Sequence, residues 1–294
     1  KVSKLFWWYN MYANVDNSIT PRPHYLADGS KVFDLYSSPA GLHEQIEAEI
    51  GTFPFFNFWG PKAGIGASQW IAKAAIKEFE INQPDLQLVY LPHLDYCLQK
   101  VGPKHESIAS EIQAIDAVVG ELINAHQDTG AEFLIVSEYG ITEVNKTVHI
   151  NKILREQGYI KVRKTLHFEN LDCGASTAFA VADHQCAHIY INDKTKLNEI
   201  KTLLENTSGI EQVLDKEAQK SFGIDHQRSG DLVAISDANA WFSSYFWLND
   251  KHAPDFARTV DIHRKVGYDP VEMFVDPKIK IPLLKIPFTV LKNT

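Results

Sequence analysis

Cysteine is scarce in this sequence: three residues, Cys97, Cys173 and Cys186, occur among 294. They lie far apart and form no C-x-x-C pair, so neither a disulfide framework nor a structural zinc knuckle is predicted. Such sparse thiols fit a reducing compartment, and we expect a cytoplasmic protein. The first residues, KVSKLFWWYN, contain no long apolar segment and no small-residue cleavage site, so they do not resemble a signal peptide.

Long apolar runs and excess positive charge are also missing. No stretch of about 18 apolar residues occurs, so no membrane span is expected. Lys and Arg total 29 against 37 Asp and Glu, which gives a formal net charge of -8. This charge repels duplex nucleic acid, because affinity for nucleic acid comes mostly from neutralising phosphates. A local basic pocket for one small phosphate ester remains open as an alternative.

The sequence does contain the pattern of a layered α/β protein. Two apolar runs of strand length, at 86–91 and 132–137, flank a long helical pattern at 107–125. Strand, long helix and strand form the crossover unit of a parallel sheet. We therefore predict an α/β fold. Because hydrophobic residues make up 45% of the chain, it has enough apolar surface for a large core.

Further elements follow from apolar spacing and from Pro and Gly breaks. The first half predicts strands at 4–12 and 53–59, an irregular loop at 16–34, and helices at 42–50 and 68–79. In the second half, short strands and helices alternate, and a small α+β insertion is expected around 188–230. No low-complexity linker is present, so residues 1–294 are predicted to form one domain with this insertion.

Acidic residues follow both strands of the predicted crossover unit. Asp95 comes after the first strand, and Glu138 follows the second within the sequence SEYG. Carboxyl ends of parallel strands meet at one edge of a sheet, where the two carboxylates could hold a cation. The structural alternatives are an aspartate that caps a turn and an exposed turn glutamate.

Histidines and aromatic runs supply weaker candidates. His263 lies beside Arg264 and Lys265 in HRKVGYDP and could bind a metal or move a proton, although a solvated loop is an equal alternative. His184 and His188 are four residues apart in a predicted turn and strand, so we expect structural roles for both. The runs FWWY, FPFFNFW and WFSSYFW could line a groove for a base or sugar, with aromatic core as the alternative. Neither a G-x-S-x-G elbow nor a P-loop occurs.

Four segments in fixed order resemble one family. LVYLPHLDYCLQKVGP, FLIVSEYGITEV, SGDLVAISD and HRKVGYDPVEMF resemble the type I phosphodiesterase/nucleotide pyrophosphatase branch of the alkaline phosphatase superfamily, and bacterial predicted nucleotide pyrophosphatases in particular. The resemblance implies an α/β/α sandwich with a mainly parallel central sheet. It also implies hydrolysis of a small phosphorylated substrate at two zinc-like divalent metal ions, with a Thr or Ser nucleophile.

The first metal motif of the family, D-x-x-G-H-x-x-G-P, matches only in part. Asp95, Gly102 and Pro103 are present, but Leu98 and Gln99 replace its glycine and histidine. The resemblance therefore implies that Asp95 is a metal ligand. Gln99 then becomes a hydrogen-bonding group for the substrate, because a neutral amide is a weak zinc ligand compared with imidazole.

The later motifs depart from the family in the same way. Within 137–140, Glu138 and Tyr139 stand where the family has Asp and His, and the late histidine of the family is Val266 here. The resemblance implies Glu138 and His263 as further metal ligands and Tyr139 as a substrate-binding group. With three imidazoles replaced, we expect the divalent, zinc-like metal to be bound weakly or lost.

The nucleophile stays unassigned. In the family, its Thr or Ser and a first metal-binding Asp precede all the segments matched here, so this chain is expected to begin after them, and no catalytic residue is named. Two functions follow from the resemblance: a phosphodiesterase or nucleotide pyrophosphatase with an altered metal site, and a catalytically reduced relative that binds a ligand or partner.

Overall fold

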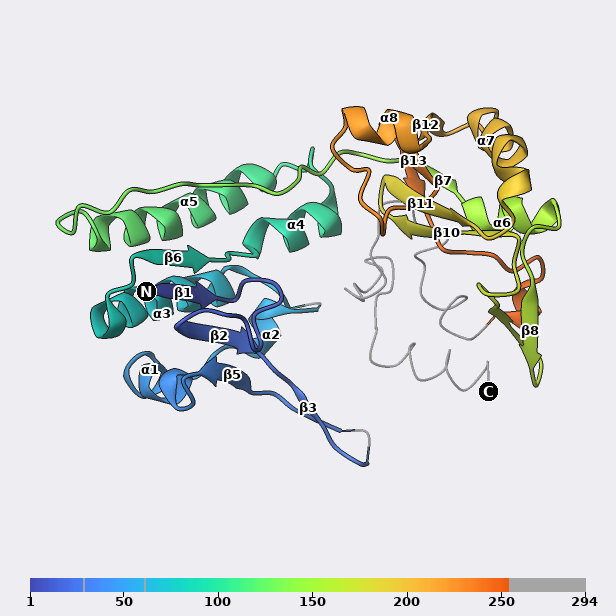
Figure 1. Cartoon of the computed structure of the whole chain (residues 1–294). Coiled ribbons are helices and arrows are strands. Elements are labelled where there is room, and N and C mark those ends of the chain that lie inside the picture. The colour runs from blue at the N-terminus through green and yellow to red at the C-terminus, as the bar shows by residue number, and fades with distance from the viewer. Residues whose placement is uncertain (29, 61, 254–294) are drawn as a thin grey trace. The chain divides into compact units, whose positions relative to one another are not determined.

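The computed structural model describes residues 1–28, 30–60 and 62–253. His263 and the apolar tail that follows it lie outside the described residues. The chain divides into two compact units, Lys1–Ile141 and Thr142–Thr294 (Figure 1). Each unit is described by itself below, and the organisation as one domain with an insertion remains a prediction.

The first unit is built on a mixed four-stranded sheet in the order β5-β2-β1-β6. β1 pairs in parallel with β2 and β6, and β5 is antiparallel to β2. The strands are β1 Val2–Leu5, β2 Asn17–Pro21, β5 Leu35–Ser38 and β6 Leu86–Val89, with a small separate hairpin of β3 His24–Tyr25 and β4 Lys31–Val32. A parallel core with one antiparallel edge strand is common in α/β proteins.

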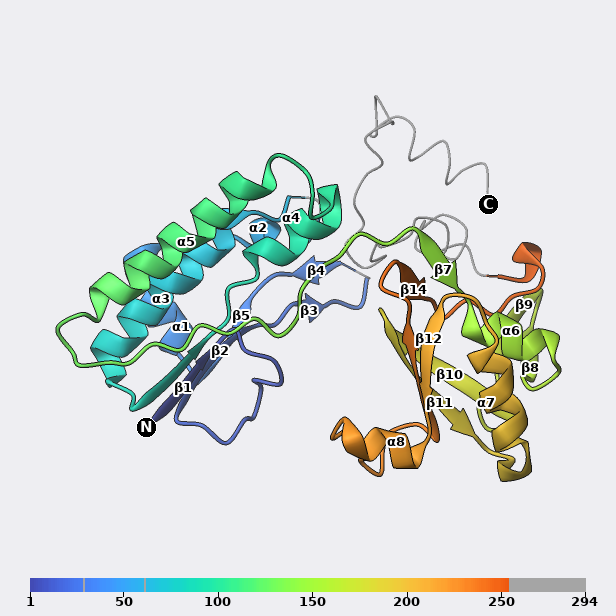
Figure 2. The ribbon, with the colours of Figure 1, turned by 90° about the horizontal axis from the view of Figure 1, so that it is seen from above.

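The helices of this unit are α1 Leu42–Ile50, α2 Phe55–Phe58, α3 Ile65–Asn82, α4 His93–Val101 and α5 Ile108–Ala125. α1, α3 and α5 lie along the same face of the sheet (Figure 2). The buried stripe of α3 packs with Leu5 and Ile19 of the sheet and with Val118 and Leu122 of α5. The predicted α/β fold class is therefore confirmed.

Helix predictions hold better than strand predictions in this unit. The helices expected at 42–50, 68–79 and 107–125 are present, as is the strand at 86–91. The strand expected at 4–12 ends at Leu5, because Phe6 turns the chain with a φ of 59°. The loop expected at 16–34 contains β2, whose only large apolar side chain is the fully buried Ile19.

The predicted strand at 53–59 is wrong. Its central residues form α2, a single helical turn. The rings of Phe53 and Phe58 both contact Phe6, with centroids 4.8 and 5.7 Å away. The aromatic side chains therefore bury themselves as a ring cluster, and no alternating strand face is needed to explain their hydrophobicity.

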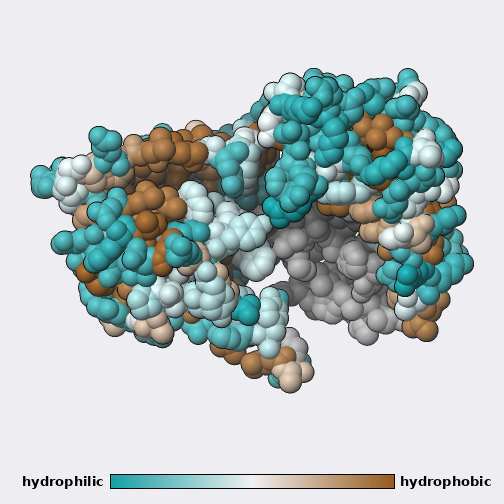
Figure 3. Space-filling model, in the orientation of Figure 1, coloured by the Kyte–Doolittle hydropathy of each residue, from teal (hydrophilic) through white to brown (hydrophobic). Residues whose placement is uncertain are grey.

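The predicted strand at 132–137 is also wrong. Residues 131–145 adopt no regular structure. Leu134, Ile135 and Val136 are 88, 70 and 71% exposed, and Figure 3 shows a hydrophobic patch at this place. An apolar run of this length is typical of a strand buried on both faces, but a strand also needs partners for its backbone hydrogen bonds. Apolar character alone does not provide them.

This exposure predicts a small effect of truncation. Leu134→Ala should change the free energy of unfolding by less than about 0.5 kcal/mol, because exposed side chains contribute little. The same truncation at Ile71, which is fully buried in α3, should cost about 2–5 kcal/mol. Urea unfolding of both variants measures the difference. A loss at Leu134 as large as that at Ile71 would show that the segment is buried.

The second unit has a four-stranded antiparallel sheet in the order β10-β11-β13-β12. Its elements are β7 Lys146–Val148, α6 Ile150–Glu156, β8 Val162–Thr165, β9 Phe168–Leu171, β10 Ala178–Asp183, β11 Cys186–Ile191, α7 Leu197–Glu205, β12 Ile210–Leu214, α8 Lys216–Ser221, β13 Leu232–Ser236 and β14 Ala240–Phe242. Short 3-10 turns at Lys194–Lys196 and Asp250–His252 complete it. Ile189, Ile191, Ile200 and Leu204 lie at the centre of its core.

The described residues also bear on the cysteines and on membrane-spanning helices. All three cysteines are free thiols. Among the described residues, no helix combines the length and the apolar character that crossing a membrane requires.

Candidate functional site

Helix α4 carries two of the predicted site residues. β6 ends at Val89, and α4 begins at His93 after a short link that contains Pro92. Asp95 lies in the first turn of α4, where the helix dipole favours a negative charge. Gln99 follows one turn later, and residues four apart lie on the same helix face. Gly102, with a φ of 85°, ends the helix.

Tyr139 lies against this helix. Its hydroxyl donates a hydrogen bond of 2.7 Å to Oδ1 of Asp95, across 44 residues of sequence. The side chain of Tyr139 is 52% exposed. Partial desolvation of its phenol and, next, its hydrogen bond to Asp95 raise the pKa of Tyr139 above its ordinary value. Tyr139 is therefore a neutral hydrogen-bond donor at physiological pH. The structure thus brings two of the predicted site residues together by a hydrogen bond, and their roles stay predictions.

Within the described residues, no hydrogen bond or ion pair joins Glu138 to Asp95. Glu138 is exposed, and its negative charge adds to the raised pKa of its neighbour Tyr139. His263 lies outside the described residues. Of the three predicted metal ligands, Asp95 alone forms a hydrogen bond to another predicted site residue within the described part of the chain.

Gln99 has an unused hydrogen-bonding group. Its Oε1 atom is buried and has no hydrogen-bond partner. A buried polar atom left in this state costs about 1–3 kcal/mol, and such atoms are rare in folded proteins. A bound ligand that offers a donor, or a cation, would satisfy the Gln99 oxygen.

The described residues do not fit a two-zinc centre. No group of three His, Cys, Asp or Glu side chains within residues 1–28, 30–60 and 62–253 is arranged to hold a metal. The predicted metal ligand on α4 is the Asp95 carboxylate, an oxygen donor that suits Mg²⁺, Mn²⁺ or Ca²⁺ better than zinc. The described residues therefore offer a cation this one carboxylate and do not by themselves form a metal site.

Aromatic residues lie near Tyr139. Tyr90 is close enough to Tyr139 to act on it electrostatically, and the ring of Trp8 contacts Tyr90 with centroids 6.1 Å apart. Trp8 is 61% exposed, whereas Phe6 two residues earlier is buried. The FWWY run thus has one ring in the core and others at the surface, and its predicted part in binding a base or sugar stays a prediction.

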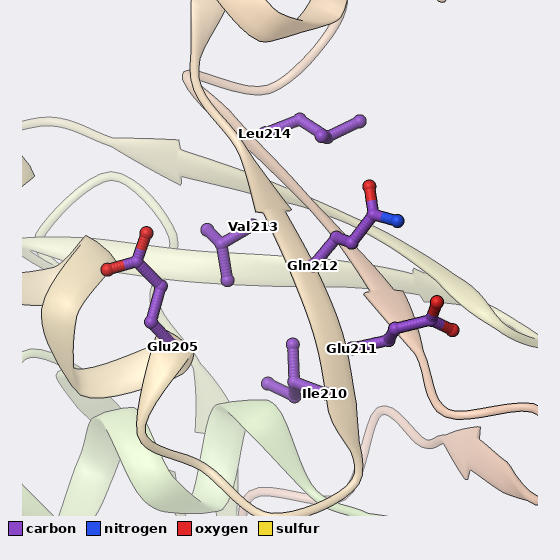
Figure 4. A pocket seen from close by; sticks show the side chains of 6 residues that line it. All are labelled: Glu205, Ile210, Glu211, Gln212, Val213 and Leu214. Carbon is purple, nitrogen blue, oxygen red and sulfur yellow. The ribbon is translucent and has the colours of Figure 1, made fainter.

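Other candidates do not join this site. Nδ1 of His188 accepts a hydrogen bond from the Gly230 amide, and the ring of His184 packs edge-on against Trp241, so both have the structural contacts expected of them. A surface hollow of about 310 Å³ lies along β12 and is lined by Glu205, Ile210, Glu211, Gln212, Val213 and Leu214 (Figure 4). Of the predicted site residues that the structure describes, none lines this hollow.

By its fold and this polar site, the protein is an α/β protein with acidic and hydrogen-bonding side chains beyond the carboxyl end of a parallel strand. The sequence model of the family described as type I phosphodiesterase / nucleotide pyrophosphatase matches residues 1–269. The chain belongs to this family, a branch of the alkaline phosphatase superfamily, as its motifs indicate. No curated protein matches the sequence.

Solved structures also resemble this chain. Phosphonoacetate hydrolase from Sinorhizobium meliloti 1021, in complex with phosphonoformate, is 20% identical with a TM-score of 0.46 over 62% of this chain and 44% of its own. Murine ectonucleotide pyrophosphatase / phosphodiesterase 5 is 15% identical with a TM-score of 0.45 over 92% of this chain and 56% of its own. The chain thus spans about half the length of these proteins.

Proposed function

We propose that this protein hydrolyses small phosphate esters, as a phosphodiesterase or nucleotide pyrophosphatase with an altered metal site. Membership of the family supports the reaction class. The observation that carries the assignment of the site is the hydrogen bond from Tyr139 to Asp95. It joins two motifs that are far apart in the sequence, at residues where the family has a metal ligand and a histidine.

Each predicted residue has a role in this proposal. Asp95, Glu138 and His263 hold one divalent cation, which when bound supplies Lewis-acid polarisation of a phosphoryl oxygen. The single hydroxyl proton of Tyr139 is donated to Asp95 in this structure. When a cation occupies Asp95, this hydroxyl turns to donate to a phosphoryl oxygen of the substrate. Gln99 orients the substrate through its amide, whose unsatisfied oxygen leaves room for one more partner.

The alternative is a catalytically reduced family member that binds a ligand or partner. It is favoured by the lack of a three-residue group of potential metal ligands in the described part of the chain. For either function, the three free cysteines support a cytoplasmic location.

Hydrolysis of bis(p-nitrophenyl) phosphate by the full-length protein tests the proposal. We expect turnover that requires added Mn²⁺ or Mg²⁺ and is abolished by EDTA, because the donors of the site cannot polarise phosphorus without a cation. Stabilisation of the protein by a nucleotide without turnover and without metal dependence would support the binding protein. Turnover that survives EDTA would contradict the altered metal site.

A further inference from the structure

Helix α4 is anchored in an unusual way. His93, at its first position, is the only fully buried residue of the helix, and the remaining positions are partly or largely exposed. A helix of nine residues gains most of its stability from packing, because an isolated helix of this length is marginal in water. The contacts of His93 therefore have a large part in fixing how α4 lies in the unit.

The imidazole of His93 is held by a carboxylate from another helix. Nε2 of His93 lies 2.7 Å from Oε2 of Glu111, which is in the first turn of α5. The His93 side chain is 3% exposed and that of Glu111 is 34% exposed. A carboxylate at one ring nitrogen fixes the orientation of an imidazole. This pair ties the first turn of α4 to the first turn of α5.

Helix α5, which carries Glu111, is held in place by apolar packing. Its Val118 and Leu122 are buried in the same apolar cluster as Ile71 and Ala75 of α3. α5 is therefore fixed by hydrophobic packing, whereas no residue of α4 belongs to this cluster and the buried side chain of α4, His93, makes a polar contact. Rotation of α4 about its axis would move Asp95 and Gln99 together, since both side chains are carried by this one short helix.

We propose that Glu111 and His93 are positioning residues. They set the rotation of α4 so that Asp95 reaches the cation and Gln99 reaches the substrate, and this inference rests on the proposed function. Binding sites tolerate displacements of only about 0.5 Å in their ligating groups. Neither residue is part of a metal or nucleophile motif of the sequence. Both act through the helix and do not touch the substrate.

Truncation of Glu111 tests this role. Glu111→Ala should weaken binding of Mn²⁺ to the full-length protein at least about tenfold in isothermal titration calorimetry, the range seen when a group that orients a ligand is lost. Glu111→Gln keeps an acceptor for the His93 ring and should bind within about threefold of the unsubstituted protein. Glu121→Ala removes an exposed glutamate from the same helix and should leave the affinity unchanged.

A double substitution separates positioning from general stability. In an Asp95→Asn background, Glu111→Ala should cause no further loss of Mn²⁺ affinity, because the α4 carboxylate that binds the cation is already gone. Its effect on the urea midpoint should be the same in both backgrounds. If Glu111→Ala does not fold, Glu111→Ser takes its place in the same series.

The possible outcomes distinguish the two proposals. Equal Mn²⁺ affinity in the unsubstituted, Glu111→Ala and Glu121→Ala proteins would overturn the positioning role alone. So would a further loss of affinity in the Asp95→Asn background. Absence of both Mn²⁺ binding and phosphodiester hydrolysis in the unsubstituted protein would overturn the proposed function, and the positioning role with it.

Discussion

Asp95→Asn is expected to slow hydrolysis of bis(p-nitrophenyl) phosphate roughly 100-fold, or about 2.7 kcal/mol at 1.36 kcal/mol for each factor of ten. Asparagine keeps the shape of the side chain and an oxygen that can accept the hydrogen bond from Tyr139. It lacks the negative charge that attracts a cation, so Mn²⁺ binding should weaken in parallel. Steady-state kinetics and calorimetry on the full-length protein measure the two effects.

Asp116 provides the matched control. It is an exposed aspartate on α5, and Asp116→Asn removes the same charge from the same unit of the protein. We expect its rate and its Mn²⁺ affinity to equal those of the unsubstituted protein. If Asp95→Asn and Asp116→Asn behaved alike, Asp95 would have no special part in binding a cation.

The second prediction concerns the stability of the second unit, where Arg155 pairs with Glu169. Arg155→Met is expected to lower the free energy of unfolding by about 3–5 kcal/mol, because it leaves a buried carboxylate without its partner. Nη1 of Arg155 lies 2.8 Å from Oε2 of Glu169, whose side chain is 5% exposed. His252 approaches the other carboxylate oxygen at 3.3 Å. Urea unfolding measures the loss.

Two controls accompany this substitution. The double variant Arg155→Met with Glu169→Leu should recover much of the stability, because no unpaired charge then remains buried. Lys220→Met breaks an exposed ion pair with Glu217 and should leave stability unchanged, because exposed pairs contribute little. A double variant less stable than Arg155→Met would contradict the account of the pair.

The same pair predicts a pH dependence. The Arg155 guanidinium, through its hydrogen bond, lowers the pKa of Glu169 below its ordinary value of 4.5. The stabilising contribution of Glu169 is therefore fully present above that value and is lost as the pH falls through the lower pKa of the folded state. The stability difference between the unsubstituted protein and Glu169→Gln should shrink as the pH is lowered below 4.5.

Helices were predictable from the sequence where the apolar pattern was regular. α1, α3 and α5 have apolar residues at helical spacing, and packing of those faces forms the core of the first unit. β2 was not predictable, because Ile19 is its only large apolar residue and its pairing with β1 is a long-range contact. The run at 132–137 shows the opposite error, since hydrophobicity signals a strand only where a partner is available.

The candidate site was predictable only through the ordered motifs. They named Asp95 and Tyr139, which the structure joins by a hydrogen bond. The buried oxygen of Gln99 and the pair of His93 with Glu111 required coordinates, because they depend on how α4 packs against its surroundings. A histidine and a glutamate 18 residues apart form no motif by themselves.

An anomalous difference map at the manganese edge, from crystals of the full-length protein grown with Mn²⁺, tests the location of the cation. We predict a peak about 2.0–2.6 Å from a carboxylate oxygen of Asp95, the range for oxygen-bound divalent cations. A peak bound elsewhere, or none at Asp95 when the crystals contain saturating Mn²⁺, would contradict the account.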